Sequence, residues 1–334
     1  MVKTVSITNF KSIRDLKFDA KRVNLFIGEP NAGKSNIIEA LSLLSLDSTK
    51  NLSSVVRFDR LANLFLDNDI KNNIAVCIDE HCLAIESKSR EIYIMRSGPG
   101  SSAKDELVIQ PSGKLLDKKG LLFEFTYFVV DSEKYKPYHF KRYEAVTATE
   151  DDYSSTLKAP YGENLAEQLI YHSALREFVS SMLQDKGYKL NLDPSRGEIN
   201  MIKEQDGVLY TYPYRLFSDT LQRIIFYFAA IESNQNAVLL FEEPEANTFP
   251  YYTKQLAERI ALDTAGNQFF IATHNPYLIA SMVEKTLIAD MSVNIVYMNN
   301  YQTKLYQLAD EQLDEILDQG PDVFYNLERF LPEV

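Results

Sequence analysis

Three short segments of this 334-residue chain carry side chains suited to acting on a phosphate anhydride. The first is GEPNAGKS, residues 28–35, which fits the phosphate-loop pattern G-x-x-x-x-G-K-S/T. Its two glycines let successive backbone N–H groups point at phosphate oxygens. Lys34 is expected to reach the β- and γ-phosphates, and the Ser35 hydroxyl is expected to bind Mg²⁺. The candidate ATP-binding residues are Gly28, Glu29, Pro30, Asn31, Ala32, Gly33, Lys34, Ser35 and Asn36.

The second segment is AVLLFEEPEA, residues 237–246, in which two carboxylates follow an apolar run. In the functional interpretation Glu242 binds Mg²⁺, and Glu243 activates the attacking water as a general base. In the alternative interpretation both acids only begin a solvated loop. The phosphate loop favours the functional interpretation, because Mg²⁺ bound there needs an acid from the end of a neighbouring strand.

The third segment is FFIATHNPYLIASM, residues 269–282, with His274 just after an apolar run. An imidazole at a strand end can hydrogen-bond a γ-phosphate or the attacking water. A lone histidine is more often structural, so this interpretation depends on the other two segments. With them, His274 joins Glu243 as a candidate catalytic residue.

Each of these segments needs a strand to carry it. The apolar run 23–27 precedes the phosphate loop, and a helical spacing of apolar residues begins near Ser35. From Asp219 onward the pattern alternates helix, buried strand, helix, buried strand, helix. Such alternation is typical of a parallel sheet covered by helices, which binds ligands at its carboxyl edge. The sequence therefore predicts an α/β fold with a mostly parallel core sheet.

The rest of the chain has a different texture. Short alternating runs between residues 74 and 130 predict antiparallel strands, and a helix is expected over 164–186, followed by two or three strands to residue 212. We expect one domain, 1–334. Its nucleotide-binding core comprises 1–45 and 215–300, its inserted β-rich and helical segment 46–214, and its acidic C-terminal cap 301–334.

Composition limits the classes of function. The net charge is −12, which argues against a broadly basic surface that binds nucleic acid. The charge is uneven, however, because residues 1–45 carry seven Lys/Arg against four Asp/Glu. The longest apolar run, 224–231, is far shorter than the roughly 20 residues that cross a bilayer. Cys77 and Cys82 are too few for a disulfide framework and favour a reducing cytoplasm. We expect a cytoplasmic protein with no membrane partner.

Together these motifs resemble the ABC-type, AAA-labelled P-loop ATPases of the RecF, SMC and overcoming-lysogenization-defect group. The opening ITNFKSIRDLKF, with the phosphate loop, is similar to that group's first strands and Walker A motif. FEEPEANTFP resembles its Walker B motif and D-loop, ATHNP its switch-histidine loop, and APYGENL (159–165) a segment before its long middle helix. The resemblance covers roughly residues 1–60 and 159–290. It implies the fold of an ABC ATPase head, ATP and Mg²⁺ as ligands, and ATP hydrolysis.

The resemblance also implies that two copies close on ATP, each covering the other's nucleotide with a signature loop. Ser218 stands where that loop has its serine, whereas Asp219 and Thr220 replace the usual paired glycines. Glu242 stands where many relatives have aspartate. No long coiled coil divides the halves, and only about 45 residues follow the histidine loop's helix, so we expect a stand-alone ATPase without a Toprim nuclease.

The leading hypothesis is an ATPase that forms a homodimer or higher oligomer through ATP and controls a protein effector encoded nearby. Phage defence or a toxin–antitoxin system is the expected setting. The alternatives are a RecF-like DNA-repair clamp and the ATPase half of a transporter. The NFKSI opening and the insert of some 110 residues between the phosphate-loop helix and APYGENL argue against the transporter.

Two segments leave their interpretation open. Residues 134–143 interleave four cationic with four aromatic residues, which fits either nucleic-acid binding or an edge hairpin with aromatics inward and charges outward. The last 26 residues carry one Arg against eight acids, with apolar positions at helical spacing. They form either a packed cap or a docking surface for a basic partner.

Overall fold

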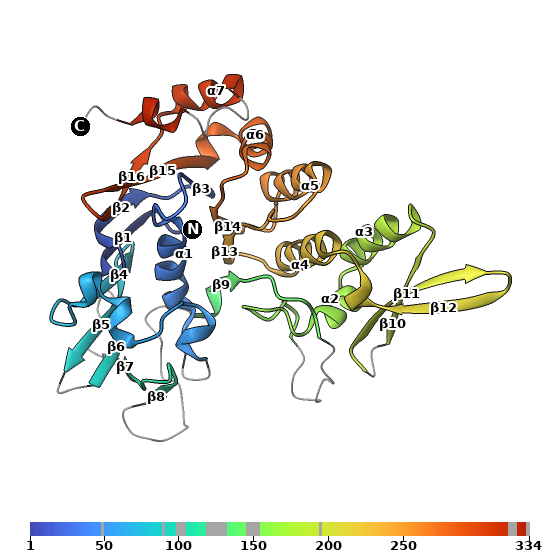
Figure 1. The fold of residues 1–334 in the computed structure, drawn as a ribbon, viewed down its shortest axis with the longest axis horizontal. Coiled ribbons are helices and arrows are strands. Elements are labelled where there is room, and N and C mark those ends of the chain that lie inside the picture. The colour runs from blue at the N-terminus through green and yellow to red at the C-terminus, as the bar shows by residue number, and fades with distance from the viewer. Residues whose placement is uncertain are drawn as a thin grey trace.

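The computed structural model describes residues 1–47, 50–88, 91–97, 105–117, 132–144, 154–193, 196–319 and 326–331. Two large sheets and a small one organise these residues (Figure 1). Within them, no helix combines the length and the apolarity needed to cross a membrane. Of the segment 74–130, in which antiparallel strands are expected, residues 89–90, 98–104 and 118–130 lie outside the described residues.

A six-stranded sheet lies at the centre, in the order β16-β15-β3-β14-β13-β9. Its strands from β9 to β15 are parallel, and only β16 runs antiparallel. Continuous apolar runs form the inner strands because both faces of the sheet are covered. The strands are β3 (Val23–Ile27), β9 (Tyr135–Tyr138), β13 (Val238–Glu242), β14 (Gln268–Ala272), β15 (Met291–Asn299) and β16 (Gln302–Gln307).

The sheet draws on every range of the chain. β9 comes from the segment 46–214, and β16 comes from the segment 301–334. Both strands therefore extend the sheet beyond the ranges 1–45 and 215–300, in which the sequence motifs lie. Long-range pairing rather than local pattern decides their membership.

Alternate residues of the central strands pack on opposite layers. Leu25 belongs to the apolar core shared with α4 (Asp219–Ser233), α5 (Pro250–Ala261) and α6 (Pro276–Lys285). Phe26 belongs to a second core shared with α1 (Lys34–Ser42). Helices thus cover both faces, with α1 on one side and α4–α6 on the other (Figure 1).

A seven-stranded antiparallel sheet packs on the α1 side, in the order β2-β1-β4-β5-β6-β7-β8. Alternation of apolar and polar residues builds it, as the sequence predicts. Its strands are β1 (Thr4–Phe10), β2 (Ile13–Asp19), β4 (Ile74–Ile78), β5 (His81–Lys88), β6 (Glu91–Ser97), β7 (Asp105–Ile109) and β8 (Leu115–Asp117).

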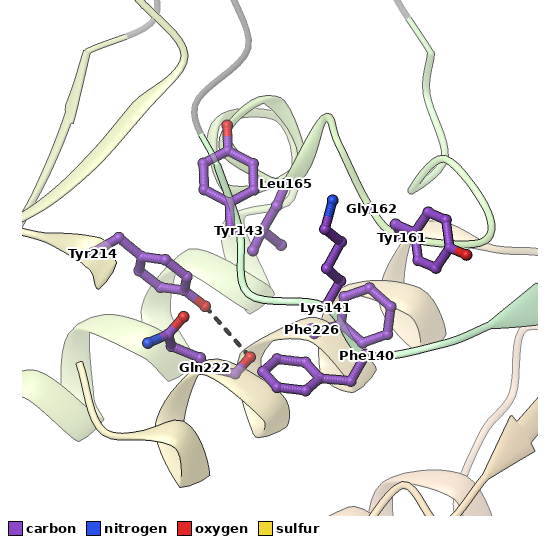
Figure 2. A pocket seen from close by; sticks show the side chains of 9 residues that line it. All are labelled: Phe140, Lys141, Tyr143, Tyr161, Gly162, Leu165, Tyr214, Gln222 and Phe226. Atoms are coloured by element: carbon purple, nitrogen blue, oxygen red, sulfur yellow. Dashed lines mark hydrogen bonds between the residues drawn. The ribbon is translucent and has the colours of Figure 1, made fainter. Parts of the chain in front are cut away.

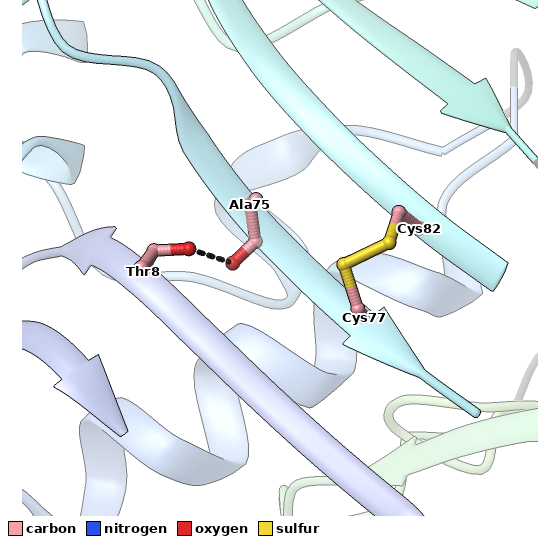
Figure 3. The surroundings of a disulfide bond; sticks show 4 residues. All are labelled: Thr8, Ala75, Cys77 and Cys82. Carbon is pink, nitrogen blue, oxygen red and sulfur yellow. Dashed lines mark hydrogen bonds between the residues drawn. A yellow bond between two sulfur atoms is a disulfide. The ribbon is translucent and has the colours of Figure 1, made fainter. Parts of the chain in front are cut away.

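The two cysteines lie opposite each other in this sheet. Cys77 of β4 pairs in register with Cys82 of β5, and the two form a disulfide (Figure 3). The two cysteines therefore give no support to the expected reducing cytoplasm, because the hairpin brings their side chains together and they are bonded.

The middle of the chain forms a helical pair and a small sheet that projects from the body (Figure 1). The single helix expected over 164–186 is wrong: α2 (Leu165–Tyr171) and α3 (Ser173–Gln184) are separated by the extended His172. The Arg176 side chain donates to the carbonyls of the last turn of α2, which satisfies groups that a continuous helix would bond itself. Three strands follow, β10 (Lys189–Asp193), β11 (Glu198–Gln205) and β12 (Val208–Pro213).

The acidic C-terminal segment packs as a cap. Leu313 and Ile316 of α7 (Asp310–Gln319) are buried in the core that contains α6, together with Leu327 and Phe330. These four apolar side chains are therefore used in packing, which favours the cap over a free docking surface. Phe324, another apolar residue of the last 26, lies outside the described residues.

Candidate nucleotide-binding site

The phosphate loop joins the buried strand β3 to α1 in the order that the sequence predicts. Gly28 has φ 149° and Gly33 has φ 103°, both in the region that favours glycine. A Cβ at Gly28 would lie 2.1 Å from the Val296 carbonyl oxygen, and one at Gly33 would lie 2.0 Å from the Thr303 hydroxyl. Each position therefore needs glycine for two reasons: the backbone conformation favours it, and a larger residue would clash.

The helix after the loop begins without a side-chain cap. Gly33 is the N-cap of α1, and in the described part of the chain no side-chain cap bonds its first turn, so the N–H groups of this turn remain available. These groups carry the positive end of the helix dipole, which attracts phosphate. The half-buried Ser35 hydroxyl also has no hydrogen-bond partner among the described residues.

Lys34 is buried and bent back over its own loop. Its Nζ donates to the carbonyl oxygens of Gly28 and Glu29, each at 2.8 Å. Burial lowers the pKa of Lys34, against the opposing effect of the charges on Glu243 and Glu242. Both acids from the end of β13 therefore lie within electrostatic reach of this lysine.

Glu242 takes part in a chain of charges that sequence reasoning missed. Arg57 donates to Glu242 at 3.2 Å and to the buried Glu39 at 2.6 Å, and Glu39 also pairs with Lys11. Burial disfavours the charge on Arg57, but the hydrogen bond to Glu39 and the charge of Glu242 outweigh it, so the pKa of Arg57 is raised. The guanidinium supplies the positive charge that a Mg²⁺ ion would supply beside this carboxylate.

His139 is a second missed residue at the same edge. It follows β9 directly, and its neighbour Tyr138 pairs with Phe241, so His139 lies opposite Glu242 in the parallel register. Burial lowers the pKa of His139, while the charges of Glu242 and Glu39 oppose that effect. Residues 134–143 mix basic and aromatic residues, which fits a hairpin as well as this strand. The sequence therefore did not predict that His139 lies at the edge of the central sheet.

Glu243 and His274 meet at the ends of β13 and β14. Their side chains are hydrogen-bonded, with 2.9 Å between Glu243 Oε1 and His274 Nδ1. Glu243 has φ 44°, a left-handed conformation that turns its carboxylate off the strand, and its N–H donates to the Ala272 carbonyl at 2.8 Å. The two candidate catalytic residues therefore form one unit.

A buried pair lies beneath that unit. The Thr273 hydroxyl donates to Glu245 Oε1, while Glu245 Oε2 has no hydrogen-bond partner among the described residues. Only 2% of Glu245 is exposed, and burial raises the pKa of its carboxyl to about 7. The sequence letters EEPEA contain this residue, but a third acid after a strand gives no local signal of burial.

Ser218 caps α4 at the exposed surface. Its hydroxyl accepts from the Leu221 N–H at 3.3 Å, so the side chain points along the helix N-terminus. Thr220, one of the two residues that replace glycines, donates to the Asn247 carbonyl at 2.9 Å. No contact joins Ser218 to the phosphate loop within the described part of the chain.

Comparison with known proteins adds the family. A family model described as "AAA domain, putative AbiEii toxin, Type IV TA system" matches residues 78–280, more than half of the chain. The chain belongs to this AAA domain family. The matched range begins after residues 28–35. Their interpretation as a phosphate loop therefore depends on their motif and geometry. No curated protein matches the chain.

This AAA domain is similar to solved structures of SMC heads. The SMC head bound to the C-winged helix domain of ScpA is 12% identical, with a TM-score of 0.52, over 94% of this chain and 99% of that one. An SMC head domain from Thermotoga maritima is 14% identical, with a TM-score of 0.43, over 92% of this chain and 99% of that one. The resemblance to P-loop ATPases of the ABC/AAA group is confirmed, and so is the α/β fold class.

The basic and aromatic segment of this AAA domain packs inward. Tyr138 is fully buried, and Phe140 and Tyr143 pack against the core. Figure 2 shows the latter two among the side chains that line a small pocket, and this pocket is too narrow to hold a water molecule. Lys141 lies over the Tyr161 ring at 5.9 Å. Tyr138 is therefore not available to stack on bases, and Phe140 and Tyr143 are only partly exposed, which favours the structural interpretation, although the segment forms an edge strand rather than a hairpin.

Proposed function

We propose that this chain binds ATP with Mg²⁺ and hydrolyses the bond between its β- and γ-phosphates. Three features support the proposal: the uncapped N-terminus of α1, the buried Lys34, and the paired Glu243 and His274 at the same sheet edge. Ser35 and Glu242 are the proposed Mg²⁺ ligands. The Ser35 hydroxyl, without a hydrogen-bond partner among the described residues, fits a cation, and Glu242 would exchange its contact with Arg57 for one with Mg²⁺. Bound Mg²⁺ would neutralise phosphate charge.

Glu243 and His274 have separate tasks in this proposal. Glu243 accepts a proton from the attacking water, whose oxygen forms a bond to the γ-phosphorus while the bond to the β-phosphate oxygen breaks. His274 fixes the Glu243 carboxylate by the 2.9 Å hydrogen bond and can donate towards the γ-phosphate from its other nitrogen. Lys34 leaves its two carbonyl partners to bind the phosphates.

We further propose that ATP closes two copies of the chain face to face. The residues named above all approach the nucleotide from one side. Ser218, at an exposed helix N-terminus, offers a hydroxyl and a positive dipole that suit a γ-phosphate held by a second copy. Hydrolysis removes that shared ligand, so the pair then opens.

The deciding experiment uses Glu243→Gln, which keeps the shape of the side chain and removes the base. We expect ATP to double the solution mass of this variant at Mg²⁺ saturation, whereas ATP hydrolysis falls by about 100-fold or more, as for loss of a general base. The unsubstituted chain under the same conditions is the control. An unchanged mass and shape of the variant with ATP would contradict face-to-face closure.

Control of a protein effector belongs to the same proposal. The family description names a toxin of a type IV toxin–antitoxin system, and the SMC head relative is bound to a partner domain. The test is to co-express each neighbouring gene in the cytoplasm of a host cell, with the unsubstituted chain or with its Lys34→Ala variant, and to measure toxicity. Toxicity that depends on Lys34 supports effector control, whereas hydrolysis stimulated by DNA would favour the RecF-like alternative.

A further inference from the structure

We propose that Glu245 is a positioning residue for hydrolysis, acting through Thr273 on His274. The inference rests on the proposed ATP hydrolysis and adds to it a group that touches neither nucleotide nor water. What points to it is a carboxylate buried beneath the two reacting side chains and bonded to the residue that precedes His274.

The Thr273 hydroxyl connects two hydrogen bonds. It donates to Glu245 and accepts from the Asn275 N–H at 3.0 Å. His274 lies between Thr273 and Asn275 in the chain, so its backbone is held on both sides by this one hydroxyl. The direction of the imidazole therefore depends on an acceptor beneath Thr273.

Glu245 is itself held firmly enough to serve as that acceptor. Its backbone carbonyl accepts from the Thr248 N–H at 3.0 Å and from the Thr248 hydroxyl at 2.7 Å, closing the turn before α5. The side chain is 2% exposed, so water cannot replace Glu245 as the partner of Thr273. A buried carboxylate is costly unless a specific contact needs it.

The two loops then meet at two levels. At the surface Glu243 bonds His274, and below it Glu245 bonds Thr273. A displacement of about 1 Å at a reacting group can slow catalysis by about 100-fold. Loosening the lower contact should therefore lower kcat without weakening ATP binding, because neither residue belongs to the phosphate loop.

The first test compares Thr273→Val with Thr273→Ser. Valine keeps the volume and loses the hydroxyl, whereas serine keeps the hydroxyl. We expect Thr273→Val to lower kcat by about 10- to 100-fold with KM and the Kd for ATP nearly unchanged, since a displaced His274 no longer orients the base Glu243. Thr273→Ser should recover most of kcat. Glu245→Ala should resemble Thr273→Val, and the double variant should be no slower than either, because both remove one contact.

A second measurement reports His274 without requiring turnover. The chain has four histidines, so His274→Asn assigns the His274 ring signal in NMR spectra. We expect Thr273→Val and Glu245→Ala to shift that signal and Thr273→Ser to leave it in place. Should the unsubstituted chain hydrolyse no ATP, the proposed function fails, while this signal still tests the link from Glu245 to His274.

Two results would overturn the positioning role. One is a folded Thr273→Val protein with unchanged kcat and an unchanged His274 signal. The other is loss of ATP binding in parallel with kcat, which would indicate general damage to the site. If Glu245→Ala does not fold, Thr273→Val alone removes the contact, and Glu245→Gln is its control, because the amide oxygen can still accept from Thr273 and should preserve the His274 signal.

Discussion

The two surfaces proposed to enclose ATP are built in opposite ways. The phosphate loop is packed from several distant segments: Val296 lies against Gly28, and Thr303 lies against Gly33 and donates to the Ala32 carbonyl at 3.0 Å. Ser218, in contrast, is exposed and bonds only within its own helix, as far as the described residues go. The phosphate loop is held in place within a single chain, whereas Ser218 lies at the surface that the proposed second copy would contact.

This difference separates binding from closure. A rigid, fully packed loop can hold nucleotide without help, so changes there should affect the affinity of one chain for ATP. An exposed helix N-terminus adds nothing until another copy approaches, so changes there should affect only assembly. Substitutions on the two surfaces should consequently produce different defects.

Lys34→Ala should have the largest effect. The lysine supplies a charge-assisted contact to the phosphates, so we expect ATP affinity to fall by at least about 1,000-fold, or ~4 kcal/mol. The fold should survive, because the Lys34 side chain bonds two carbonyls of its own loop and no other group among the residues described. Calorimetric titration with ATP and a thermal melt measure the two quantities. A variant that binds ATP as tightly as the parent would remove the phosphate-loop assignment.

Ser218→Arg should leave ATP binding nearly intact and prevent closure. The longer side chain fills the space at the exposed helix N-terminus. Its positive charge also opposes the positive end of the helix dipole there. In the Glu243→Gln background, the ATP-dependent doubling of mass should disappear. Ser218→Ala is the matched control, expected to weaken closure only in part. Closure that persists with arginine, checked by cross-linking near position 218, would show that this surface faces solvent in the dimer.

How much of this could be predicted from the sequence depends on distance along the chain. The phosphate loop, the acids after β13 and His274 are recognisable because each motif lies next to its own apolar strand. Thr303 was not recognisable, since it meets Ala32 across 271 positions. The same holds for Arg57, which reaches Glu242 across 185 positions from a segment that looks like a linker.

Local pattern also misled in two places. β9 lies in the segment 134–143, whose mixture of basic and aromatic residues fits a hairpin as well as the parallel edge strand that forms. The break at His172 has no glycine or proline to announce it and depends on Arg176 reaching back to the preceding turn. In both cases a contact made only in the folded chain decides the outcome.

Glu245→Gln should change how stability depends on pH. Burial raises the carboxyl pKa from 4.5 to about 7 in the folded chain, so the folded state holds this proton more tightly than the unfolded state. Its contribution is fully present below about pH 4.5 and is lost as the pH rises to about 7. At 1.36 kcal/mol per pKa unit the loss is roughly 3 kcal/mol.

Glutamine has no proton to lose, so the variant should gain on the parent across that window. The free energy of unfolding of both proteins at pH 5 and pH 8 measures the difference. We expect the variant to be the more stable at pH 8 by an amount that shrinks at pH 5. Parallel curves would mean that Glu245 keeps an ordinary pKa in the folded chain.

Thr303→Val should have the smallest effect and tests the rigidity of the phosphate loop. Its hydroxyl bonds the Ala32 carbonyl at 3.0 Å and lies 2.6 Å from the Ser12 hydroxyl, which in turn accepts from Asn36 at 2.7 Å. Valine keeps the volume against Gly33 and removes these bonds, at about 1–2 kcal/mol of stability. If packing of the loop sets ATP affinity, binding should weaken by a few-fold while Thr303→Ser stays near the parent. An unchanged Kd with lowered stability would show that the loop keeps its shape through its glycines alone, and that the contact with β16 serves only the fold.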